Sequence, residues 1–313
     1  MKMETTRKPK EIIGHLMVLS TIIIYSFNTN FMKILMPTWI GPHGLVLLRC
    51  AVMAAGFWLI SCFISTKGET KPTRKDILMM MLGGVLGIGG NLLLYINGLN
   101  MTGPVDAFVI RTTQPIIVIA LAVLLLHASF NRYKAIGIAL GLAGTIYVSI
   151  SPHAGAVKDS ITGDVLIFVS SVFNALYLIL IKPYTQKFNS VIVMRWMSLA
   201  ALIITLPFGI HQALTAPIFT TAAPTHVWLQ LGFVLVFATM IAYFLNLKAL
   251  VYITPFVESV YIYLLPITGA TVSILLGLQK FSWHDPIALV LIVIGFILIN
   301  KKTQKIKSKQ PTT

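Results

Sequence analysis

Charged residues are scarce in this chain: Asp, Glu, Lys and Arg together make up only 11% of its 313 residues. A soluble domain usually carries about 25% charged residues. So few charged side chains cannot cover a globular surface that faces water. Hydrophobic residues reach 57% and the mean hydropathy is +0.86. We therefore expect lipid to cover most of the surface of the folded protein.

Cysteines and catalytic motifs are also few. Cys50 and Cys62 lie in the same apolar segment, where a helix would separate them by about 18 Å along its axis, too far for a disulfide. The sequence shows no metal-ligand spacing and no recognised nucleotide-binding or hydrolase motif. We therefore expect no metal, no cofactor and no catalytic residue, and a protein that is not an enzyme.

Long apolar runs are what the chain has in abundance. A helix needs about 20 apolar residues to span a bilayer. The runs predict an all-α integral membrane protein with ten transmembrane helices. The predicted spans are 12–35, 44–65, 77–98, 104–127, 133–151, 161–181, 190–212, 226–247, 256–277 and 285–300.

The chain contains an internal repeat. The segment Pro104–Ile146 matches Pro255–Ile297 at one constant offset, which also places Pro115 on Pro266. Each copy holds five apolar segments, and an odd number of spans turns the second copy upside down relative to the first. The sequence therefore predicts two inverted-topology five-helix repeats. The predicted parts are an N-terminal tail 1–11, a first repeat 12–151, an outer linker 152–160, a second repeat 161–300 and a basic tail 301–313.

The net charge of +15 reflects membrane orientation. When the N-terminus is placed inside, the outer loops receive only Lys158 and Lys280, and the other loop lysines and arginines are cytoplasmic. This positive-inside bias predicts that both termini are cytoplasmic, in a bacterial cytoplasmic membrane. Basic tails bind anionic lipid, so binding to the bilayer accounts for the net positive charge. We therefore expect the lipid bilayer as a partner and no nucleic acid.

Glycines are concentrated in the predicted span 77–98. Their spacing places small residues on one helix face, which lets helices approach closely. We expect this packing within one chain, so a monomer is favoured over a homodimer. The glycines are Gly83, Gly84, Gly87, Gly89 and Gly90.

Polar side chains recur on one face of the span 12–35, at Thr21, Tyr25 and Asn28, and the equivalent face of the span 161–181 is polar too. A polar stripe is costly in lipid, so it should face protein or water. Hydrogen bonds between helices and a hydrated substrate cavity both explain it. The candidate substrate-binding residues on such faces are Tyr25, Asn28, Asn91, Tyr95, Asn174, Tyr177, Tyr243 and Asn246.

Arg111 is the most informative charged residue. It lies in the predicted span 104–127, about 10 Å below the outer surface, and shares a helix face with Gln114. A guanidinium at this depth needs an anion, carbonyl groups or water. We therefore predict that Arg111 and Gln114 contact substrate, with Arg111 binding a carboxylate or phosphate group. A fixed internal ion pair is the alternative.

Glu258 occupies the repeat equivalent of Ala107, near the predicted cytoplasmic end of its helix. The helix geometry puts it about 15 Å from Arg111 along the membrane normal. The two should therefore flank one path rather than form a direct ion pair. Three roles remain open for Glu258: a proton-titrating site, a cytoplasmic gate and a solvated acid at a helix start.

The other charged residues near the spans have structural explanations. Lys33 should extend its amino group to the interface. Arg49 and Arg195 align between the two copies, so a packing role is expected for both. Asp106 falls in the first turn of its predicted helix, where the helix dipole favours an anion.

Pro115 and Pro266 each lie within a predicted span. A proline there removes one backbone hydrogen bond, and membrane helices tolerate such breaks where neighbours or cavity water satisfy the freed carbonyl. A hinge and a static kink are both consistent with this placement.

The repeats and these prolines and glycines resemble the EamA family of the drug/metabolite transporter superfamily, from about Gly14 to Asn300. The matching residues are Pro104–Val105, Gln114–Pro115, Gly137, Gly144, Thr254–Pro255, Leu265–Pro266 and Gly295. Family members often carry a Gly-Glu pair where this chain has Ala128 and Gln279. The resemblance implies transport of small metabolites through a central cavity. The spans that it implies as lining are 12–35, 77–98, 104–127, 161–181, 226–247 and 256–277.

The expected function is secondary transport by alternating access of a small metabolite, amino-acid-like or otherwise anionic or zwitterionic. The alternatives are a lipid-modifying membrane enzyme and a channel. The enzyme would need clustered acids or histidines near one face, and the histidines are scattered along the chain.

Overall fold

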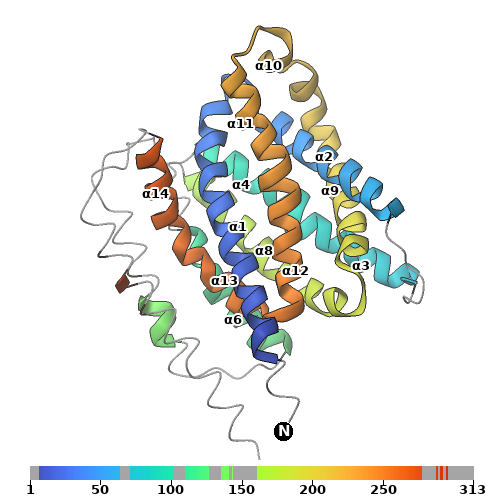
Figure 1. The fold of residues 1–313 in the computed structure, drawn as a ribbon, viewed down its shortest axis with the longest axis vertical. Coiled ribbons are helices and arrows are strands. Elements are labelled where there is room, and N and C mark those ends of the chain that lie inside the picture. Colours follow the sequence, from blue (N-terminus) through green and yellow to red (C-terminus); the bar gives the residue numbers. More distant parts are fainter. Residues whose placement is uncertain are drawn as a thin grey trace, which may run out of the picture.

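A computed structural model describes residues 7–63, 71–101, 110–126, 135–140, 143, 161–276, 287, 290–291 and 294, and the regular elements in this part of the chain are helices (Figure 1). In the first half they are α1 (Arg7–Leu35), α2 (Pro42–Phe63), α3 (Arg74–Gly84), the π-helix η1 (Val85–Gly89), α4 (Gly90–Met101) and α6 (Gln114–Leu126). In the second half they are α8 (Ile161–Lys187), α9 (Ser190–Leu214), α10 (Pro217–Thr220), α11 (Thr225–Leu235), the π-helix η2 (Val236–Ile241), α12 (Ala242–Tyr252), α13 (Pro255–Val260), the 3-10 helix η3 (Tyr261–Leu264) and α14 (Leu265–Leu275).

Six helices in the described residues are long and apolar enough to cross a membrane. They are Glu11–Leu35, Pro42–Phe63, Arg74–Met101, Ile161–Lys187, Ser190–Leu214 and Thr225–Tyr252. Each coincides with a predicted span, although the predicted ends at 181 and 247 are too early. The predicted spans 133–151 and 285–300 lie largely outside the described residues, so the count of ten helices stays a prediction.

Equivalent first helices of the two copies run in opposite directions. Gly14, near the start of α1, packs directly against the side chain of Ile253. Lys182, near the end of α8, donates to the backbone carbonyl of Ile253 at 2.8 Å and to that of Leu250. The start of α1 and the end of α8 therefore meet the same end of α12, as an inverted repeat requires.

The second helices are also antiparallel. A Cβ atom on Gly44, at the start of α2, would lie 2.9 Å from the backbone nitrogen of Ala213, at the end of α9. At the other end of this helix pair, the rings of Trp58 and Trp196 meet with centroids 5.8 Å apart. The helices α2 and α9 therefore pack together along their length in opposite directions.

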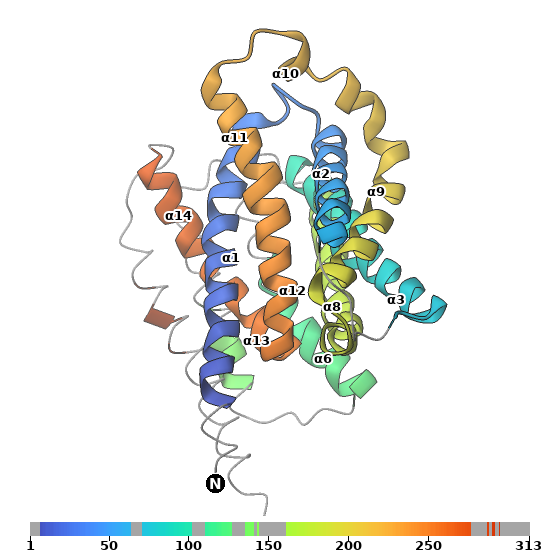
Figure 2. The same ribbon diagram turned by 45° about the vertical axis from the view of Figure 1, so that its right-hand side comes forward.

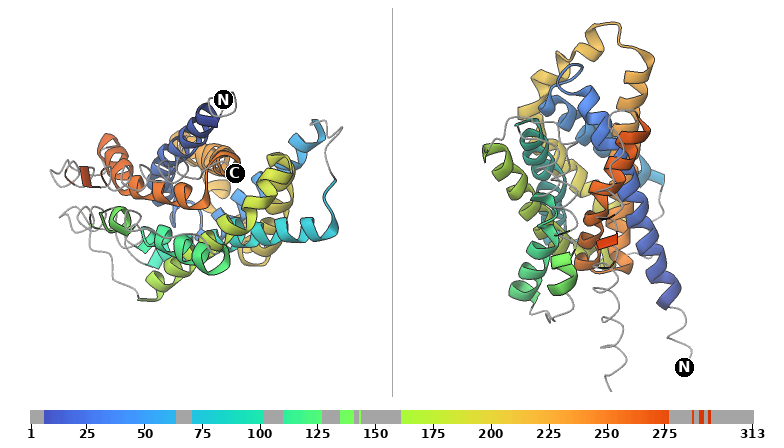
Figure 3. Two further views of the ribbon diagram at one scale, coloured as in Figure 1. Left: turned by 90° about the horizontal axis from the view of Figure 1, so that it is seen from below. Right: turned by 90° about the vertical axis from the view of Figure 1, so that its left-hand side faces the viewer.

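The two copies interlock. Helix α1 of the first copy packs on α12 and α14 of the second, and α8 of the second copy packs on α4 and α6 of the first (Figures 1 and 2). Seen from below, blue α1 lies with the orange helices, and yellow-green α8 lies against the teal ones (Figure 3, left). Any cleft between these two groups is therefore lined by both copies.

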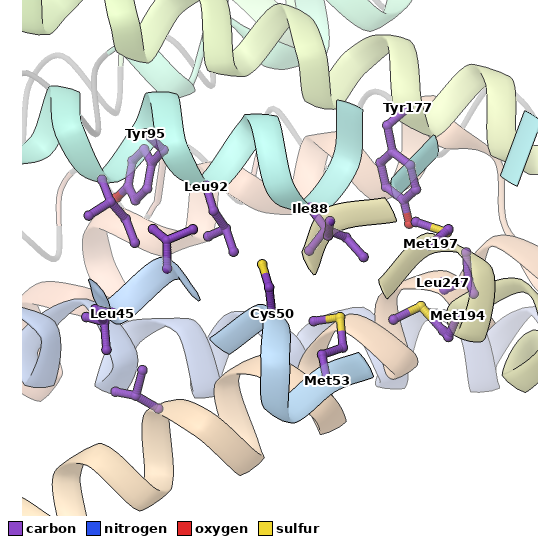
Figure 4. Close-up of a cluster of buried hydrophobic side chains, with 14 of the residues drawn as sticks. Leu45, Cys50, Met53, Ile88, Leu92, Tyr95, Tyr177, Met194, Met197 and Leu247 are labelled. Carbon is purple, nitrogen blue, oxygen red and sulfur yellow. The ribbon is translucent and has the colours of Figure 1, made fainter. Parts of the chain in front are cut away.

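The main hydrophobic core lies where α2, α4, α8 and α9 meet (Figure 4), with Met53, Ile88 and Met194 fully buried. Glycines let the backbones approach there. A Cβ atom on Gly84 would collide with the backbone carbonyl of Met197. The expectation that the glycine run serves close packing within one chain is therefore confirmed for this position.

Two π-helical segments occupy equivalent places in the copies. Val85 at the start of η1 falls on Val236 at the start of η2, at the offset that places Pro104 on Pro255. A π segment widens the turn and shifts its hydrogen bonds by one residue. In η2 the hydroxyl of Thr239 donates to the carbonyl of Val234 at 2.7 Å. Neither π segment has a recognisable pattern in the sequence.

Gln212 joins the ends of α9 and α2, and its removal should destabilise the fold. Its Oε1 accepts from the backbone N–H groups of His43, at 2.9 Å, and Gly44, at 3.1 Å. Gln212→Leu leaves these helix-start donors without that acceptor, at a cost of about 1–3 kcal/mol. We expect a lower midpoint of thermal unfolding in detergent. Gln230→Leu is the matched control, because the Oε1 of Gln230 is buried and has no partner in the part of the chain that the structure describes. Equal midpoints for both variants would contradict the prediction.

Candidate functional site

One cavity between the two copies brings together all the residues predicted to bind substrate. They are Tyr25, Asn28, Asn91, Tyr95, Arg111, Gln114, Asn174, Tyr177, Tyr243 and Asn246, and Glu258 lines the same cavity. The lining comes from α1, η1, α4, α8, α12, α13, η3, the starts of α6 and α14, and Arg111 just before α6. These are the spans that the resemblance implies, with Arg49 of α2 as an addition.

The polar residues differ in their hydrogen bonding, and an interhelical bond explains only some of them. Asn91 on α4 donates to the backbone carbonyl of Ser170 on α8 at 2.7 Å, which is a hydrogen bond between helices. Asn28 behaves differently: its Nδ2 lies 3.8 Å from the sulfur of Met32, and its Oδ1 is buried with no partner among the described residues. The ring of Tyr25 meets that of Tyr243 edge-on, with centroids 6.3 Å apart. The stripe of α1 therefore keeps hydrogen-bonding capacity for the cavity.

Among the described residues, five of the ten buried side-chain atoms without a hydrogen-bond partner belong to lining residues of this cavity. Such atoms are rare in native proteins, and each costs about 1–3 kcal/mol when it stays unsatisfied. Several such atoms around one cavity leave hydrogen-bonding capacity that a solute or water can use. The unpaired atoms among the lining residues are Asn28 Oδ1, Arg111 Nε, Gln114 Oε1, Asn246 Oδ1 and Glu258 Oε2.

Arg111 stands at a break in its helix. Its guanidinium carbon lies 4.5 Å from the centroid of the Tyr95 ring, a cation–π contact that fixes its direction. Thr112 and Thr113 form a turn before α6 begins at Gln114. Within the described residues no ion pair of Arg111 is found, while Asp106, expected at the start of this helix, lies outside them.

Glu258 is buried in the first turn of α13. Its side chain is 7% exposed, and its Oε2 is buried with no hydrogen-bond partner among the described residues. The alternative of a solvated acid at a helix start is therefore wrong, whereas the proton-titrating and gating roles stay open. Arg111 and Glu258 line one cavity without an ion pair between them.

Arg49 is the residue that sequence reasoning missed. It is 2% exposed, and its Nε donates to the hydroxyl of Thr239 at 2.8 Å. Its repeat equivalent Arg195 lines no part of the cavity and stacks against Trp58 and Trp196, at 4.8 and 5.0 Å from their ring centroids. The expected packing role therefore fits Arg195, but it is incomplete for Arg49. The apolar helix around Arg49 offers no sequence signal for the direction of its side chain.

The remaining predicted positions are placed as follows. The helix is interrupted just before each proline, by the turn preceding Pro115 and by η3 preceding Pro266. Both copies therefore have a break in the helix at this position. Bending of the helices at these breaks stays a prediction. Lys33 is exposed near the end of α1, which agrees with an amino group at the interface.

These features define a class: a helical membrane protein in which two interlocked, inverted copies enclose a polar cavity. The chain belongs to the EamA-like transporter family, whose sequence profile matches residues 12–150 and 161–301. Both repeats thus match the same family.

Similar proteins agree with this assignment. The uncharacterized transporter YetK of Bacillus subtilis (strain 168) is 21% identical over 263 residues, which cover 81% of this chain and 77% of the relative. The uncharacterized transporter YyaM of the same organism is 24% identical, with 83% and 84% covered. A crystal structure that is 16% identical superposes with a TM-score of 0.74 over 96% of this chain and 99% of its own, which supports the fold.

Proposed function

We propose that this protein is a secondary transporter that moves a small anionic or zwitterionic metabolite across the bacterial cytoplasmic membrane by alternating access. The cavity carries the proposal, because both repeats contribute unpaired buried polar atoms to it. A cation at Arg111 and an acid at Glu258 suit a solute with charged groups. Both termini are cytoplasmic in this proposal, as the charge bias indicates.

Alternating access is supported by the relation between the copies. Inverted repeats of one sequence can exchange conformations, and this exchange turns an outward-open path into an inward-open one. The paired breaks before Pro115 and Pro266 are suitable bending points, since a proline leaves the carbonyl four residues earlier without its helical partner. Helix halves on either side of these breaks could then tilt about the cavity.

An enzymatic role has less support. Arg111 and Glu258 have no nucleophile and base arranged beside them among the described lining residues. The described histidines, at positions 15, 43, 211 and 226, do not line the cavity. The relatives are named transporters.

Solute counterflow in liposomes tests the proposal. Purified protein is reconstituted in vesicles preloaded with an unlabelled solute, and entry of the same labelled solute is followed without any other energy source. A carrier gives transient, saturable accumulation that depends on the preloaded solute, whereas a channel gives simple equilibration. We expect accumulation with at least one small acid or amino acid. Equilibration for every solute that enters would contradict alternating access.

A further inference from the structure

We infer that Arg49 is a second cationic group of the cavity that binds the solute, and that this solute carries a net negative charge. This inference rests on the proposed function and narrows its substrate class. Arg49 was expected to have a packing role, whereas its side chain lines the cavity.

Arg49 is held by neutral partners. Its Nε donates to Thr239 Oγ1 at 2.8 Å, and one terminal nitrogen reaches the carbonyl of Ala238 at 3.4 Å. The other terminal nitrogen lies 3.3 Å from the sulfur of Met32. A guanidinium keeps its charge at every physiological pH. None of these described partners neutralises that charge, and a buried charge is costly unless an anion pairs with it.

The π-helix η2 positions this cation. Ala238 and Thr239 both lie within η2, and the hydroxyl of Thr239 also donates to Val234. The widened turn therefore offers an acceptor carbonyl and a fixed hydroxyl oxygen to one guanidinium. The aligned position of Thr239 in the first copy is Ile88, which has no hydroxyl. This difference explains why Arg49 and Arg195 have different surroundings.

The charges of the described lining residues do not cancel. The charged residues among them are Arg49, Arg111 and Glu258. Their net charge is +1 when Glu258 is ionised and +2 when it is protonated. Tyr25 and Tyr243 line the same cavity as both arginines. The edge-on tyrosine pair thus lies in the field of two cations. A solute with net charge −1 or −2 neutralises this cavity, whereas a neutral zwitterion or a cation does not.

The shared ligand chemistry is a small organic acid with a carboxylate or a phosphate group. Guanidinium groups bind both through paired N–H donors. Five probes separate the classes: glutarate, glycerol 3-phosphate, glutamate, glutamine and lysine. Glutamate, glutamine and lysine have amino-acid ends in common and differ in net charge, so their comparison isolates the charge requirement. Glutarate and glycerol 3-phosphate distinguish a carboxylate site from a phosphate site.

Calorimetric titration of the purified full-length protein with these probes tests the inference. We expect binding of at least one of the three acids and no measurable binding of glutamine or lysine. Arg49→Gln should weaken the binding of that acid at least tenfold, and Arg49→Lys should weaken it less. Arg195→Gln is the matched control, because Arg195 is the repeat equivalent outside the cavity, and it should bind the acid as the natural protein does.

Thr239→Val keeps the charge of Arg49 and removes its hydroxyl partner. It should weaken acid binding by a few fold, and together with Arg49→Lys it decides the outcome if Arg49→Gln fails to fold. The inference is overturned if none of the acids binds, if glutamine or lysine binds as well as the acids, or if the Arg49 variants bind the acid normally. Counterflow of a neutral or cationic solute that survives Arg49→Gln would overturn it while leaving the proposed function intact. Simple equilibration of every solute would instead contradict the proposed function.

Discussion

Arg111→Gln is expected to abolish transport of the solute while the protein still folds and inserts. The variant keeps a polar side chain and removes the charge beside Tyr95. Truncating one partner of a buried, hydrogen-bonded charge pair costs about 2–5 kcal/mol, which corresponds to a loss of affinity of about 30-fold or more. Arg111→Lys keeps the charge and loses the planar fork, so it should retain partial activity with weakened apparent affinity. Concentration-dependent counterflow in liposomes measures both effects.

Arg195→Gln controls for the loss of an arginine in a membrane helix. Arg195 also stacks on aromatic rings and also has a buried, unpaired Nε, but it lies outside the cavity lining. Its loss should lower thermal stability and leave the apparent affinity unchanged. Normal transport by both Arg111 variants would show that Arg111 is no substrate ligand. Misfolding of both would assign it to a structural network, and the polarity of the cavity would then rest on its Asn and Tyr residues.

Much of the described fold follows from hydrophobic length and from the repeat. A run of apolar residues long enough to cross the bilayer has to be helical there, because lipid offers backbone groups no other partner. Helix ends are less well defined in the sequence. The helix α8 continues through Pro183 to Lys187, although a proline usually ends a helix. The helix α12 continues to Tyr252, and its end is hard to predict because the polarity of the sequence changes little there.

The cavity could be predicted in part because its residues repeat with a helical period. Tyr25 and Asn28 share a face of α1, and the equivalent face of α8 carries Asn174 and Tyr177. Arg49 could not be placed in this way, since it is alone among apolar neighbours. Its direction depends on η2, and a π segment shifts the backbone by one residue without a recognisable sequence pattern. The roles of all these residues in binding stay predictions.

The contact between Asp76 and Lys187 provides a direct test of motion between the copies. Lys187 Nζ lies 3.0 Å from Asp76 Oδ1, which joins the start of α3 to the end of α8 and thus the first copy to the second. The repeat equivalents of this pair are Val227 and Thr38, so the inverted end of the protein has no matching ion pair. The side chain of Lys187 is 49% exposed, and water and salt screen such a pair. The pair alone therefore stabilises this end only weakly.

A covalent link at this place should have a much larger effect than loss of the ion pair. Alternating access opens the cavity at one end and then at the other, and we expect α3 and α8 to shift relative to each other in this cycle, so a fixed bridge between them should hold the protein in one state. We expect that a cleavable bifunctional thiol reagent abolishes counterflow of the variant with Asp76→Cys, Lys187→Cys and Cys62→Ser, and that a reductant restores it. Cys62→Ser removes the exposed native thiol, and Cys50 is buried. The two single-cysteine variants treated with the same reagent should transport normally, because one modified thiol joins nothing. If mass spectrometry shows the bridge while transport continues at the rate of the untreated protein, then this end of α3 and α8 does not open during the cycle, and the moving elements must be the helix halves beyond Pro115 and Pro266.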